Sequence, residues 1–283
     1  MKKYKVLYNL KGNNSQAEAE TKQLDKILAG DELEYFDVLK IDDVSAFVSA
    51  LEPDVSLIIS GGDGTLNHFV NDTKGIEYKN DIYYFGTGTG NDFLRSIKAE
   101  KGTLVKLNDI IAKLPTVTVN GKEYLFINGV GFGIDGYCCE MGDKLRETSD
   151  KPINYTSIAI KGLLFHFKPR NATVIVDGKT KSFKKVWIAP TMFGECYGGG
   201  MYPTPGQKRS DGTVSAMIFY GKGRLKTLMV FPSIFKGEHI NHTDMVEVIK
   251  GKEVTVEFDS PASLQIDGET IIGVTKYSVK APE

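Results

Sequence analysis

Residues 1–116 alternate short apolar runs with segments of helical periodicity, and this alternation restricts the fold more than any other feature. The apolar runs are 4–8, 33–38, 55–59 and 82–85, and the helical segments are 15–28, 43–51 and 65–71. Strands and helices in this order form a parallel sheet with helices on both faces. The sequence therefore predicts an α/β N-terminal domain built on a doubly wound parallel sheet.

The pattern changes after Leu114-Pro115, where strands and turns dominate. The predicted strands are 116–119, 124–127, 172–176, 182–189, 213–220, 253–258, 263–266 and 277–280, and helical stretches are expected at 154–167 and 224–235. Asn120-Gly121 and Asp177-Gly178 are hairpin turn signals. We expect two domains, 1–116 and 117–283, the second a mainly antiparallel, β-sandwich-like domain, with a hinge near Pro115 and the active site in the cleft between them.

Composition excludes several classes of protein. The 35 lysines and arginines balance 36 aspartates and glutamates, so no nucleic-acid partner is expected. Cys138, Cys139 and Cys196 are too few for a disulfide framework, which favours a cytoplasmic location. Lys161 and His166 interrupt the longest apolar stretch, so no transmembrane segment is expected.

A glycine-rich turn follows the apolar run 55–59 directly. Gly61, Gly62 and Gly64 surround Asp63, and a helix is expected to start near Thr65. Glycine is common in tight strand-to-helix turns because it tolerates positive φ. A bare backbone at a helix N-terminus also offers N–H groups to a phosphate. Both interpretations remain open from this turn alone.

A second turn of the same kind follows the strand at 82–85. It contains Gly88, Thr89, Gly90, Asn91 and Asp92, and the last two are residue types that cap helix N-termini. Turns after different strands of a parallel sheet gather at its carboxyl edge. Two such turns therefore indicate a cradle for one polyphosphate.

Two other nucleotide-motif matches are weaker. Gly178-Lys179-Thr180 lacks the upstream glycine of a P-loop, because Thr173 stands there, and it falls in a predicted hairpin. The segment from Gly131 to Gly136 matches G-x-G-x-x-G but is not followed by a second strand that ends in an acidic residue. Neither is expected to bind a nucleotide.

Four segments in order resemble the diacylglycerol kinase catalytic-domain family, which includes soluble bacterial lipid kinases and is related to sphingosine and ceramide kinases. They are GGDGT at 61–65, GTGNDF at 88–93, FINGVGFGID at 126–135 and IDGE at 266–269. NAD kinases and phosphofructokinases share the first segment. The second narrows the resemblance to lipid kinases.

The resemblance implies an ATP-dependent kinase that transfers the γ-phosphoryl group to the hydroxyl of a diacylglycerol-like lipid at a membrane surface. It implies Glu269 as the base, Asp92 beside the magnesium ion that arrives with ATP, and Asp135 as support for that network. The nucleotide-binding residues that it implies are Asn9, Gly61, Gly62, Asp63, Gly64, Thr65, Gly88, Thr89, Gly90 and Asn91. Cradles of backbone N–H groups and a carboxylate-held Mg²⁺ suit phosphoryl transfer.

Each of these acidic residues also has a structural interpretation. Glu269 follows Asp267-Gly268, which is a hairpin signal. Asp135 can cap a turn, Asp92 can cap its helix, and Asp63 can orient the glycine loop. An NAD kinase-like activity on a soluble nucleotide and a non-catalytic nucleotide-binding regulator therefore remain alternatives. His68 is expected to be a helix-surface residue.

Two departures from the family pattern matter. The first strand leads into Asn9, Lys11 and Gly12, so Lys11 is the one candidate for a lysine near the phosphates. Related kinases hold a structural Mg²⁺ at an Asp-Gly matched here by Asp211, but the position three residues earlier is Lys208. We expect the Lys208 ammonium to pair with Asp211 and to weaken this metal site. The alternative is that Lys208 points into solvent and contributes only its carbonyl oxygen, which would leave the site functional.

The two helical stretches of the second domain have two interpretations. Residues 222–236 combine lysines and an arginine with Leu225, Met229 and Phe235, and residues 154–167 are also rich in apolar side chains. Such a helix either covers a sheet or lies in a membrane interface. The sequence is also compatible with a homodimer.

Overall fold

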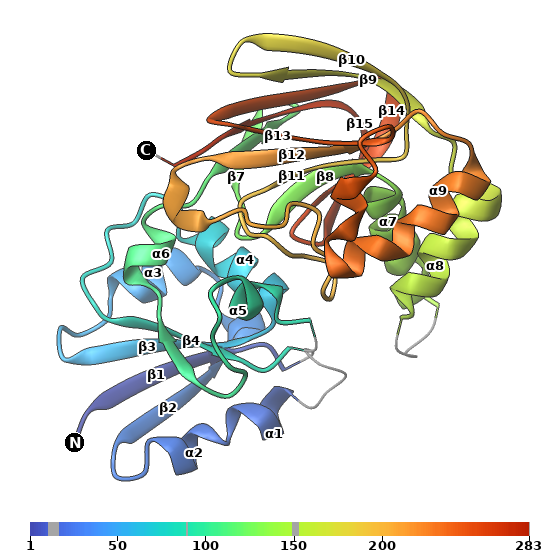
Figure 1. Ribbon diagram of the computed structural model, residues 1–283. Coiled ribbons are helices and arrows are strands. Elements are labelled where there is room, and N and C mark those ends of the chain that lie inside the picture. Colours follow the sequence, from blue (N-terminus) through green and yellow to red (C-terminus); the bar gives the residue numbers. More distant parts are fainter. Residues whose placement is uncertain (11–16, 89, 149–152, 283) are drawn as a thin grey trace. The chain divides into compact units, whose positions relative to one another are not determined.

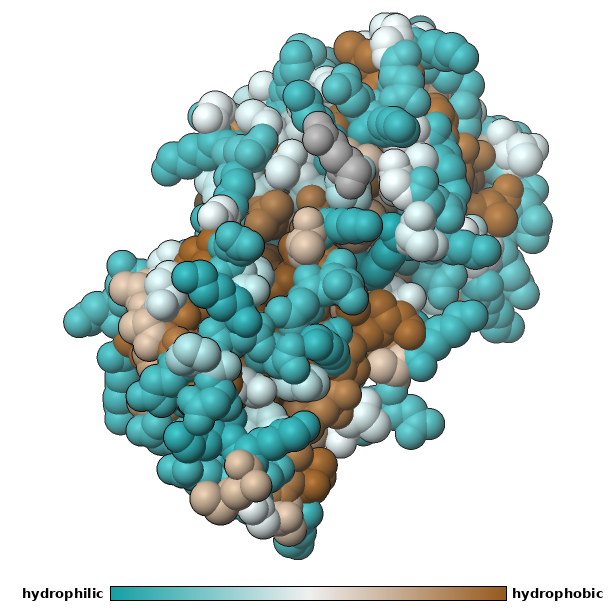
Figure 2. Space-filling view, turned by 90° about the vertical axis from the view of Figure 1, so that its left-hand side faces the viewer, coloured by the Kyte–Doolittle hydropathy of each residue, from teal (hydrophilic) through white to brown (hydrophobic). Residues whose placement is uncertain are grey.

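The computed structural model describes residues 1–10, 17–88, 90–148 and 153–282. The chain divides into two compact units, Met1–Leu114 and Pro115–Glu283. The division lies two residues before the boundary expected from sequence. In one view of the surface, hydrophilic side chains cover most of the visible face and apolar ones show between them (Figure 2).

Unit 1 is built on a five-stranded sheet in the order β2-β1-β3-β4-β5 (Figure 1). Its strands are β1 (Lys3–Tyr8), β2 (Glu32–Asp37), β3 (Val55–Gly61), β4 (Ile82–Gly86) and β5 (Leu104–Lys106). The first four strands pair in parallel, and β5 pairs antiparallel with β4. The predicted doubly wound α/β class is confirmed, with one antiparallel edge strand that the sequence analysis did not find.

Short helices connect these strands and lie on both faces of the sheet (Figure 1). They are α1 (Ala17–Thr21), α2 (Leu24–Ile27), η2 (Val38–Lys40), α3 (Val44–Ser49), α4 (Asp63–Asp72), α5 (Asp92–Ser96) and α6 (Asn108–Ile111). Buried apolar side chains of β1 and β3, such as Val6 and Ile58, pack against Leu24 of α2. The described part of the helix expected at 15–28 is two short helices.

Unit 2 is an antiparallel β domain, as predicted. The strands formed by its described residues are β6 (Thr116–Val119), β7 (Lys122–Leu125), β8 (Gly129–Gly133), β9 (Arg170–Val176), β10 (Lys179–Val186), β11 (Ile188–Met192), β12 (Val214–Phe219), β13 (Val246–Gly251), β14 (Glu253–Ile266) and β15 (Glu269–Lys280). The main path is β13-β12-β11-β8-β14-β15-β6-β7, and β9 joins β14 to β10. The expected strand 182–189 is two strands, and the strands expected at 253–258 and 263–266 are one.

Strand β14 has a different partner along each half. Its first half, around Val256, pairs with β9, and its second half, Leu264 to Ile266, pairs with β8. The register against β15 shifts at Ala262, between the two halves. Register shifts of this kind bend a strand. One long strand therefore belongs to two parts of the β domain.

Helices gather at one end of unit 2 and bury an apolar cluster there (Figure 1). They are α7 (Ile134–Arg146), α8 (Tyr155–Lys161), the π-helical turn η3 (Gly162–His166), α9 (Arg224–Val230), η5 (Phe231–Lys236) and η6 (Glu238–Asn241). The 3₁₀ turn η4 (Arg209–Asp211) lies apart from this cluster, where Asp211 pairs with Lys250 of β13. Trp187, Phe219 and Phe231 are members of the cluster. Sequence reasoning expected α8 and α9 but missed α7.

The glycines of the G-x-G-x-x-G match serve close packing between backbones. A Cβ at Gly131 would lie 2.5 Å from the Cα of Pro190 in β11. Gly133 has φ +112, and a Cβ there would lie 2.6 Å from the Cα of Ile188. Strand β8 can therefore pair with β11 only because these positions lack side chains. This packing accounts for the motif without a dinucleotide.

Candidate nucleotide-binding and catalytic residues

The two glycine-rich turns of unit 1 approach each other at the carboxyl ends of β3 and β4. A Cβ at Gly62 would lie 3.3 Å from the Cα of Gly88, and a Cβ at Gly88 would lie 2.6 Å from the Cα of Gly62. The backbone N–H of Thr87 also donates to the carbonyl oxygen of Gly61 at 2.9 Å. The predicted proximity of the two turns is therefore present in the fold.

Asp63 fastens one turn to the other. Its carboxylate accepts hydrogen bonds from the backbone N–H of Asp92 at 2.9 Å and of Phe93 at 3.0 Å. Both donors belong to the first turn of α5. The carboxylate of the first loop thus caps the helix that follows the second loop, and helix N-termini favour such negative charge. The structural role expected for Asp63 is present, but it acts on the neighbouring turn.

Asn91 and Asp92 shape the second turn. Asn91 has φ 49, in the left-handed region, and its Nδ2 donates to the carbonyl oxygen of Gly88 at 2.6 Å. Its Oδ1 is buried and has no hydrogen-bond partner among the residues that the structure describes. Asp92 is 4% exposed and pairs with Arg95 at 3.2 Å. Thr89, also predicted to bind nucleotide, lies outside the described residues.

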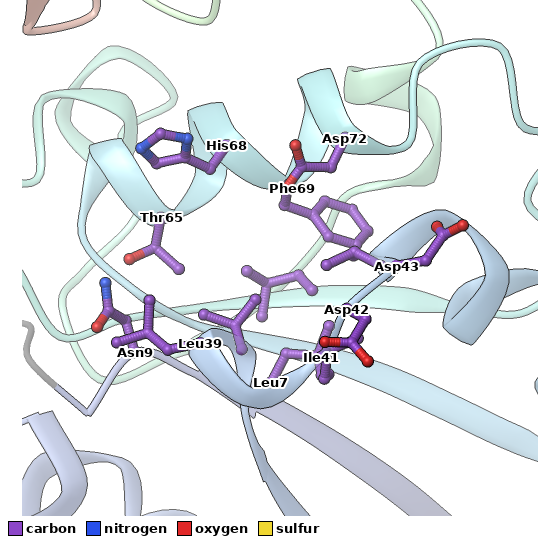
Figure 3. Close-up of a pocket in the computed structure, with 13 residues that line it drawn as sticks. Leu7, Asn9, Leu39, Ile41, Asp42, Asp43, Thr65, His68, Phe69 and Asp72 are labelled. Carbon is purple, nitrogen blue, oxygen red and sulfur yellow. The ribbon is translucent and has the colours of Figure 1, made fainter.

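A cavity of about 470 Å³ opens beside these turns, within unit 1. Thr65, His68 and Phe69 of α4 form one wall, and Leu7 and Asn9 at the end of β1 lie opposite (Figure 3). The remaining lining residues are Val38, Leu39, Ile41, Asp42, Asp43, Val44, Ile59 and Asp72. The volume lies within the range typical of small-molecule sites.

The cavity contains residues that the sequence analysis did not select. Asp42 and Asp43 come from the segment between β2 and α3, and Asp43 also caps α3 through the N–H of Ala46 at 2.9 Å. The cap signal predicts the helix, but no local pattern shows that this segment reaches the end of β1. His68 is exposed, as expected, and also lines the cavity. Lys11 and Gly12 lie outside the described residues.

Asp135 is a buried carboxyl group at the start of α7. Its carboxylate accepts hydrogen bonds from the N–H of Gly136 at 2.9 Å and from the hydroxyl of Tyr197 at 3.1 Å. Burial raises the pKa of Asp135 to about 7, against the lowering effect of these donors. Burial and the neighbouring Asp135 also raise the pKa of Cys138 to about 12. Asp135 therefore belongs to an internal polar network.

Asp267 anchors the hairpin between β14 and β15. It has φ 47, and its carboxylate accepts from the N–H groups of Ile127 at 2.5 Å, Asn128 at 2.8 Å and Gly129 at 2.9 Å. Arg209 donates to the carbonyl oxygen of Ile127 and, at 2.8 Å, to Oδ1 of Asn128. Neither Asp267 nor Arg209 was selected from sequence.

Glu269 begins β15 directly after that turn, and its side chain is exposed. Ile266 of β14 pairs with Glu269 on one side and with Val130 of β8 on the other. Helix α7, which carries Asp135, starts directly after β8. The hairpin interpretation of Asp267-Gly268-Glu269 is therefore correct as structure, and it leaves the Glu269 carboxylate accessible for chemistry.

The predicted pairing of Lys208 with Asp211 is wrong. Asp211 Oδ2 lies 2.9 Å from Nζ of Lys250, which projects from β13. Lys208 is exposed and accepts a backbone hydrogen bond from Asp211 through its carbonyl oxygen. The sequence analysis took Lys208, three residues before Asp211, as the partner of this carboxylate. The partner in the structure is Lys250, which lies on β13 and is 39 residues away in the sequence. An ammonium group on this carboxylate does not suit a divalent cation.

No group of three or more histidine, cysteine, aspartate or glutamate side chains is placed to hold a metal ion within the part of the chain that the structure describes. A metal that arrives with a nucleotide needs fewer protein ligands, because Mg²⁺ is commonly held by one or two carboxylates together with phosphates. Asp92, in the first turn of α5 after the second glycine turn, is the acidic residue that the sequence analysis assigned to this ion, and in the structure it is 4% exposed and paired with Arg95. The same described residues form no helix long and apolar enough to cross a membrane.

Comparison with known proteins identifies both units. Residues 3–120 match the diacylglycerol kinase catalytic domain, and residues 128–281 match the YegS C-terminal NAD kinase beta sandwich-like domain. A diacylglycerol kinase of Mycobacterium tuberculosis is 26% identical over 210 residues, which is 71% of this chain and 66% of that protein. A diacylglycerol kinase of Bacillus subtilis is 25% identical over 220 residues, which is 75% of this chain and 70% of that protein.

The fold has solved counterparts. A crystal structure of a diacylglycerol kinase from Bacillus anthracis superimposes with a TM-score of 0.64 at 18% identity, and it covers 100% of this chain and 94% of that one. The order of the family segments, the two domain matches and the shared fold agree. The chain belongs to the diacylglycerol kinase catalytic-domain family, a family of lipid kinases.

Proposed function

We propose that this protein is an ATP-dependent kinase that transfers the γ-phosphoryl group of ATP to the hydroxyl of a diacylglycerol-like lipid. The observation that carries the proposal is the close approach of the Gly61–Thr65 and Gly88–Asn91 turns, fastened by Asp63. Two glycine-rich turns at the carboxyl edge of a parallel sheet give phosphate oxygens access to backbone N–H groups. This arrangement supports a polyphosphate site.

The adjoining cavity supports a nucleotide in particular. It begins at Thr65, the last residue of the first turn, and continues along apolar Leu7 and Leu39 to Asp42 and Asp43. Apolar walls suit the faces of a base, and the carboxylates are acceptors for ribose or base donors. We therefore place the nucleoside in this cavity and the phosphates at the glycine turns, with Asn9 between β1 and the cavity.

The remaining roles divide between the two units. Asp92 is the proposed carboxylate for the Mg²⁺ that comes with ATP, and that ion neutralises phosphate charge when bound. Glu269, exposed at the start of β15, is the proposed base that accepts the proton of the attacking hydroxyl. Asp135 stays buried and supports the β8–α7 junction through Gly136 and Tyr197.

Support for a lipid acceptor comes from the family rather than from a pocket. The relatives from M. tuberculosis and B. subtilis are both named diacylglycerol kinase. An acceptor of this class has a free primary hydroxyl that an ionised carboxylate can deprotonate as the phosphoryl group moves. We therefore propose a diacylglycerol-like lipid in place of a soluble nucleotide such as NAD.

The test is transfer of labelled γ-phosphate from ATP to a total lipid extract, followed by mass identification of the product. The proposal expects label in a phosphorylated diacylglycerol and none in NADP when NAD replaces the lipid. Label in NADP alone would establish an NAD kinase activity. ATP binding without transfer to any acceptor would indicate a non-catalytic regulator.

A further inference from the structure

Gln265 is a buried polar residue near the end of β14, shortly before the turn that leads to Glu269. The side chain of Gln265 is 2% exposed. Its Oε1 accepts a hydrogen bond from the backbone N–H of Gly268 at 2.9 Å. Gly268 has φ +98 and directly precedes Glu269. The Gln265 side chain therefore holds the residue from which the backbone of Glu269 continues.

Gln265 and the carboxylate of Asp135 lie on the same face of the sheet. Gln265 stands opposite Gly131 in the ladder between β14 and β8. Residues opposite each other in an antiparallel ladder share one face, with Cβ positions about 5 Å apart. A Cβ at Gly131 would lie 2.8 Å from Oδ2 of Asp135. The carboxylate therefore takes space that a side chain at position 131 would need, next to the side chain of Gln265.

Helix α7 fastens this face of the hairpin by two further polar contacts. Thr270 stands opposite Gln265 in β15, and its Oγ1 donates to the carboxylate of Asp143 at 2.7 Å. Ser263 of β14 donates through its hydroxyl to the carboxylate of Glu140. These contacts fix α7, and with it Asp135, against the strands that carry the turn.

One end of the Gln265 amide has no hydrogen bond. Nε2 is buried and has no hydrogen-bond partner among the residues that the structure describes. A buried N–H group without an acceptor is unfavourable. The Gln265 amide also lowers the pKa of Asp135, which is the effect of a donor on an ionised carboxylate. Because Oε1 is held by Gly268, the donor is Nε2, and the ionised carboxylate of Asp135 is the acceptor that it lacks.

Asp135 changes its charge near neutral pH, because burial raises its pKa to about 7. The titratable groups coupled to it are Tyr197, Cys138, Cys139 and Tyr277. Burial raises the pKa of each of these four above its ordinary value, so all four are neutral at pH 7. Further along α7, Glu140 pairs with Lys144 and Asp143 with Arg146.

We propose that Gln265 is a positioning residue for Glu269, and that it acts by linking Gly268 to the ionised carboxylate of Asp135. Oε1 keeps its hydrogen bond from Gly268, and Nε2 donates to Asp135. A protonated Asp135 attracts Nε2 less and can itself donate to Oε1, which draws that atom away from Gly268. The turn before Glu269 is therefore held best when Asp135 is ionised. The inference rests on the proposed function, in which Glu269 is the base.

The test compares Gln265→Met with the unmodified protein, because methionine is of similar length and lacks both amide groups. We expect kcat to fall by roughly 10-fold, since a displaced reacting group slows the reaction, while the KM for ATP stays unchanged. In the unmodified protein kcat should rise from about pH 6 to about pH 8, on either side of the Asp135 pKa of about 7. This rise should be smaller in Gln265→Met. Turnover and pH dependence equal to those of the unmodified protein would overturn the proposal.

Gln207→Met is the matched control. Gln207 is also a buried glutamine of unit 2, and its amide forms hydrogen bonds with Lys208, Thr213 and Ser215. The Gln207→Met variant should unfold at a lower temperature but keep the kcat and the pH profile of the unmodified protein. An equal fall in kcat in both methionine variants would assign the effect to lost stability and refute the positioning role.

Gln265→Glu separates the two ends of the amide. It keeps an oxygen that accepts from Gly268, but it replaces Nε2 with a second carboxyl oxygen beside Asp135. Two neighbouring carboxylates repel each other when both are ionised, so this variant should not recover turnover at pH 8. Full turnover of Gln265→Glu at pH 8 would show that the bond to Gly268 suffices and would refute the link to Asp135.

A measurement without substrate keeps this inference separate from the proposed function. The titration of Asp135 can be followed by carbon NMR of the aspartate carboxyl groups, with Asp135→Asn to assign its signal. The pKa of Asp135 should be higher in Gln265→Met than in the unmodified protein, and it should not change in Gln207→Met. If this rise is found but no lipid accepts phosphate, the kinase proposal fails and the link from Asp135 to Gln265 stands. If Gln265→Met phosphorylates lipid normally and the pKa does not move, the link fails and the kinase stands.

Discussion

Oδ2 of Asp63 lies 2.9 Å from the backbone nitrogen of Asp92, although the two residues belong to different strand-to-helix turns. The same carboxylate also holds the N–H of Phe93. The position of the second glycine turn relative to the first is therefore set by a side chain and by backbone contact together. A change at Asp63 should affect both stability and phosphate binding.

We expect Asp63→Ala to lower the free energy of unfolding by about 1–2 kcal/mol, because the first turn of α5 loses its cap. ATP affinity, measured by calorimetry, should fall at the same time. Asn154→Ala is the matched control, since Asn154 caps α8 through the N–H of Ser157 at 2.9 Å in the other unit. The Asn154→Ala variant should lower the free energy of unfolding by a similar amount and leave the ATP affinity unchanged. If Asp63→Ala bound ATP as tightly as the unmodified protein, the proposed phosphate cradle at the two glycine turns would be contradicted.

Gly88→Ala should separate the two turns. The new Cβ would lie 2.6 Å from the Cα of Gly62, so backbone must move. Overpacking of this kind costs about 1–3 kcal/mol. Urea unfolding and ATP titration should both report the change. Gly223→Ala adds a methyl group where no atom of the described residues lies within 4 Å and should leave both measurements unaltered. Wild-type ATP affinity in Gly88→Ala would show that the phosphates bind elsewhere.

Glu269→Gln should lower turnover by a factor on the order of 10² or more, because the amide cannot accept the proton of the attacking hydroxyl. ATP affinity should stay nearly unchanged. Glu253→Gln, an exposed glutamate at the start of β14, serves as the control and should keep full turnover. Full turnover in Glu269→Gln would leave the residue with a role in the hairpin alone.

Asp267→Asn should lower both stability and turnover. It keeps a residue type that tolerates the left-handed conformation, but it replaces an ionised acceptor of three N–H groups. Lost hydrogen bonds to buried donors cost about 1–3 kcal/mol. Asp177 has the same φ of 47, and its carboxylate accepts from the backbone N–H groups of Lys252 and Glu253. Asp177 is far from Glu269 in the sequence. Asp177→Asn should therefore lower stability with no effect on turnover, and an equal effect of both variants on turnover would argue against a positioning role for Asp267.

The stability of unit 2 should depend on pH through Asp135. Its pKa is about 7 in the folded protein, against 3.8 for an unperturbed aspartate, so the folded form binds the proton more tightly between these values. The stabilising contribution of the proton is complete below pH 3.8 and disappears as the pH rises to about 7. The slope is at most about 1.4 kcal/mol per pH unit. Asp135→Asn should remove this component, and parallel unfolding curves of the two proteins at pH 5 and 7 check it. The same pH dependence in both would assign it to other groups.

Sequence patterns for strands and turns predicted several parts of the structure correctly. The run Val55–Ile59 and the glycines after it predicted β3 and the first turn, and Asn120-Gly121 and Asp177-Gly178 are turns with positive φ at both residues. These features depend on residues adjacent in sequence. The proximity of the two glycine turns was also predictable, because parallel strands bring such turns to one edge.

The features that sequence reasoning missed depend on partners far along the chain. Lys250 reaches Asp211 from a neighbouring strand, and Asp267 collects N–H groups from residues 127–129. Helix α7 was missed because its glycines, Gly136 and Gly142, weaken the helical signal. They are required by contact with β14 and with Tyr155, respectively. No pattern within one segment reports such contacts.

The placement of β14 also determines when unit 2 can form. This strand and β15 come last in the order of its elements, yet they lie between β8 and β6 in the sheet, and β9 pairs with β14 as well. The early strands of unit 2 therefore emerge from the ribosome without the neighbours that satisfy their hydrogen bonds. All strands of unit 1 precede those of unit 2 in the chain, so unit 1 can pair its strands before the strands of unit 2 have been synthesised. The order of translation thus separates an early-folding half from one whose unpaired edges stay open until β14 and β15 have been made.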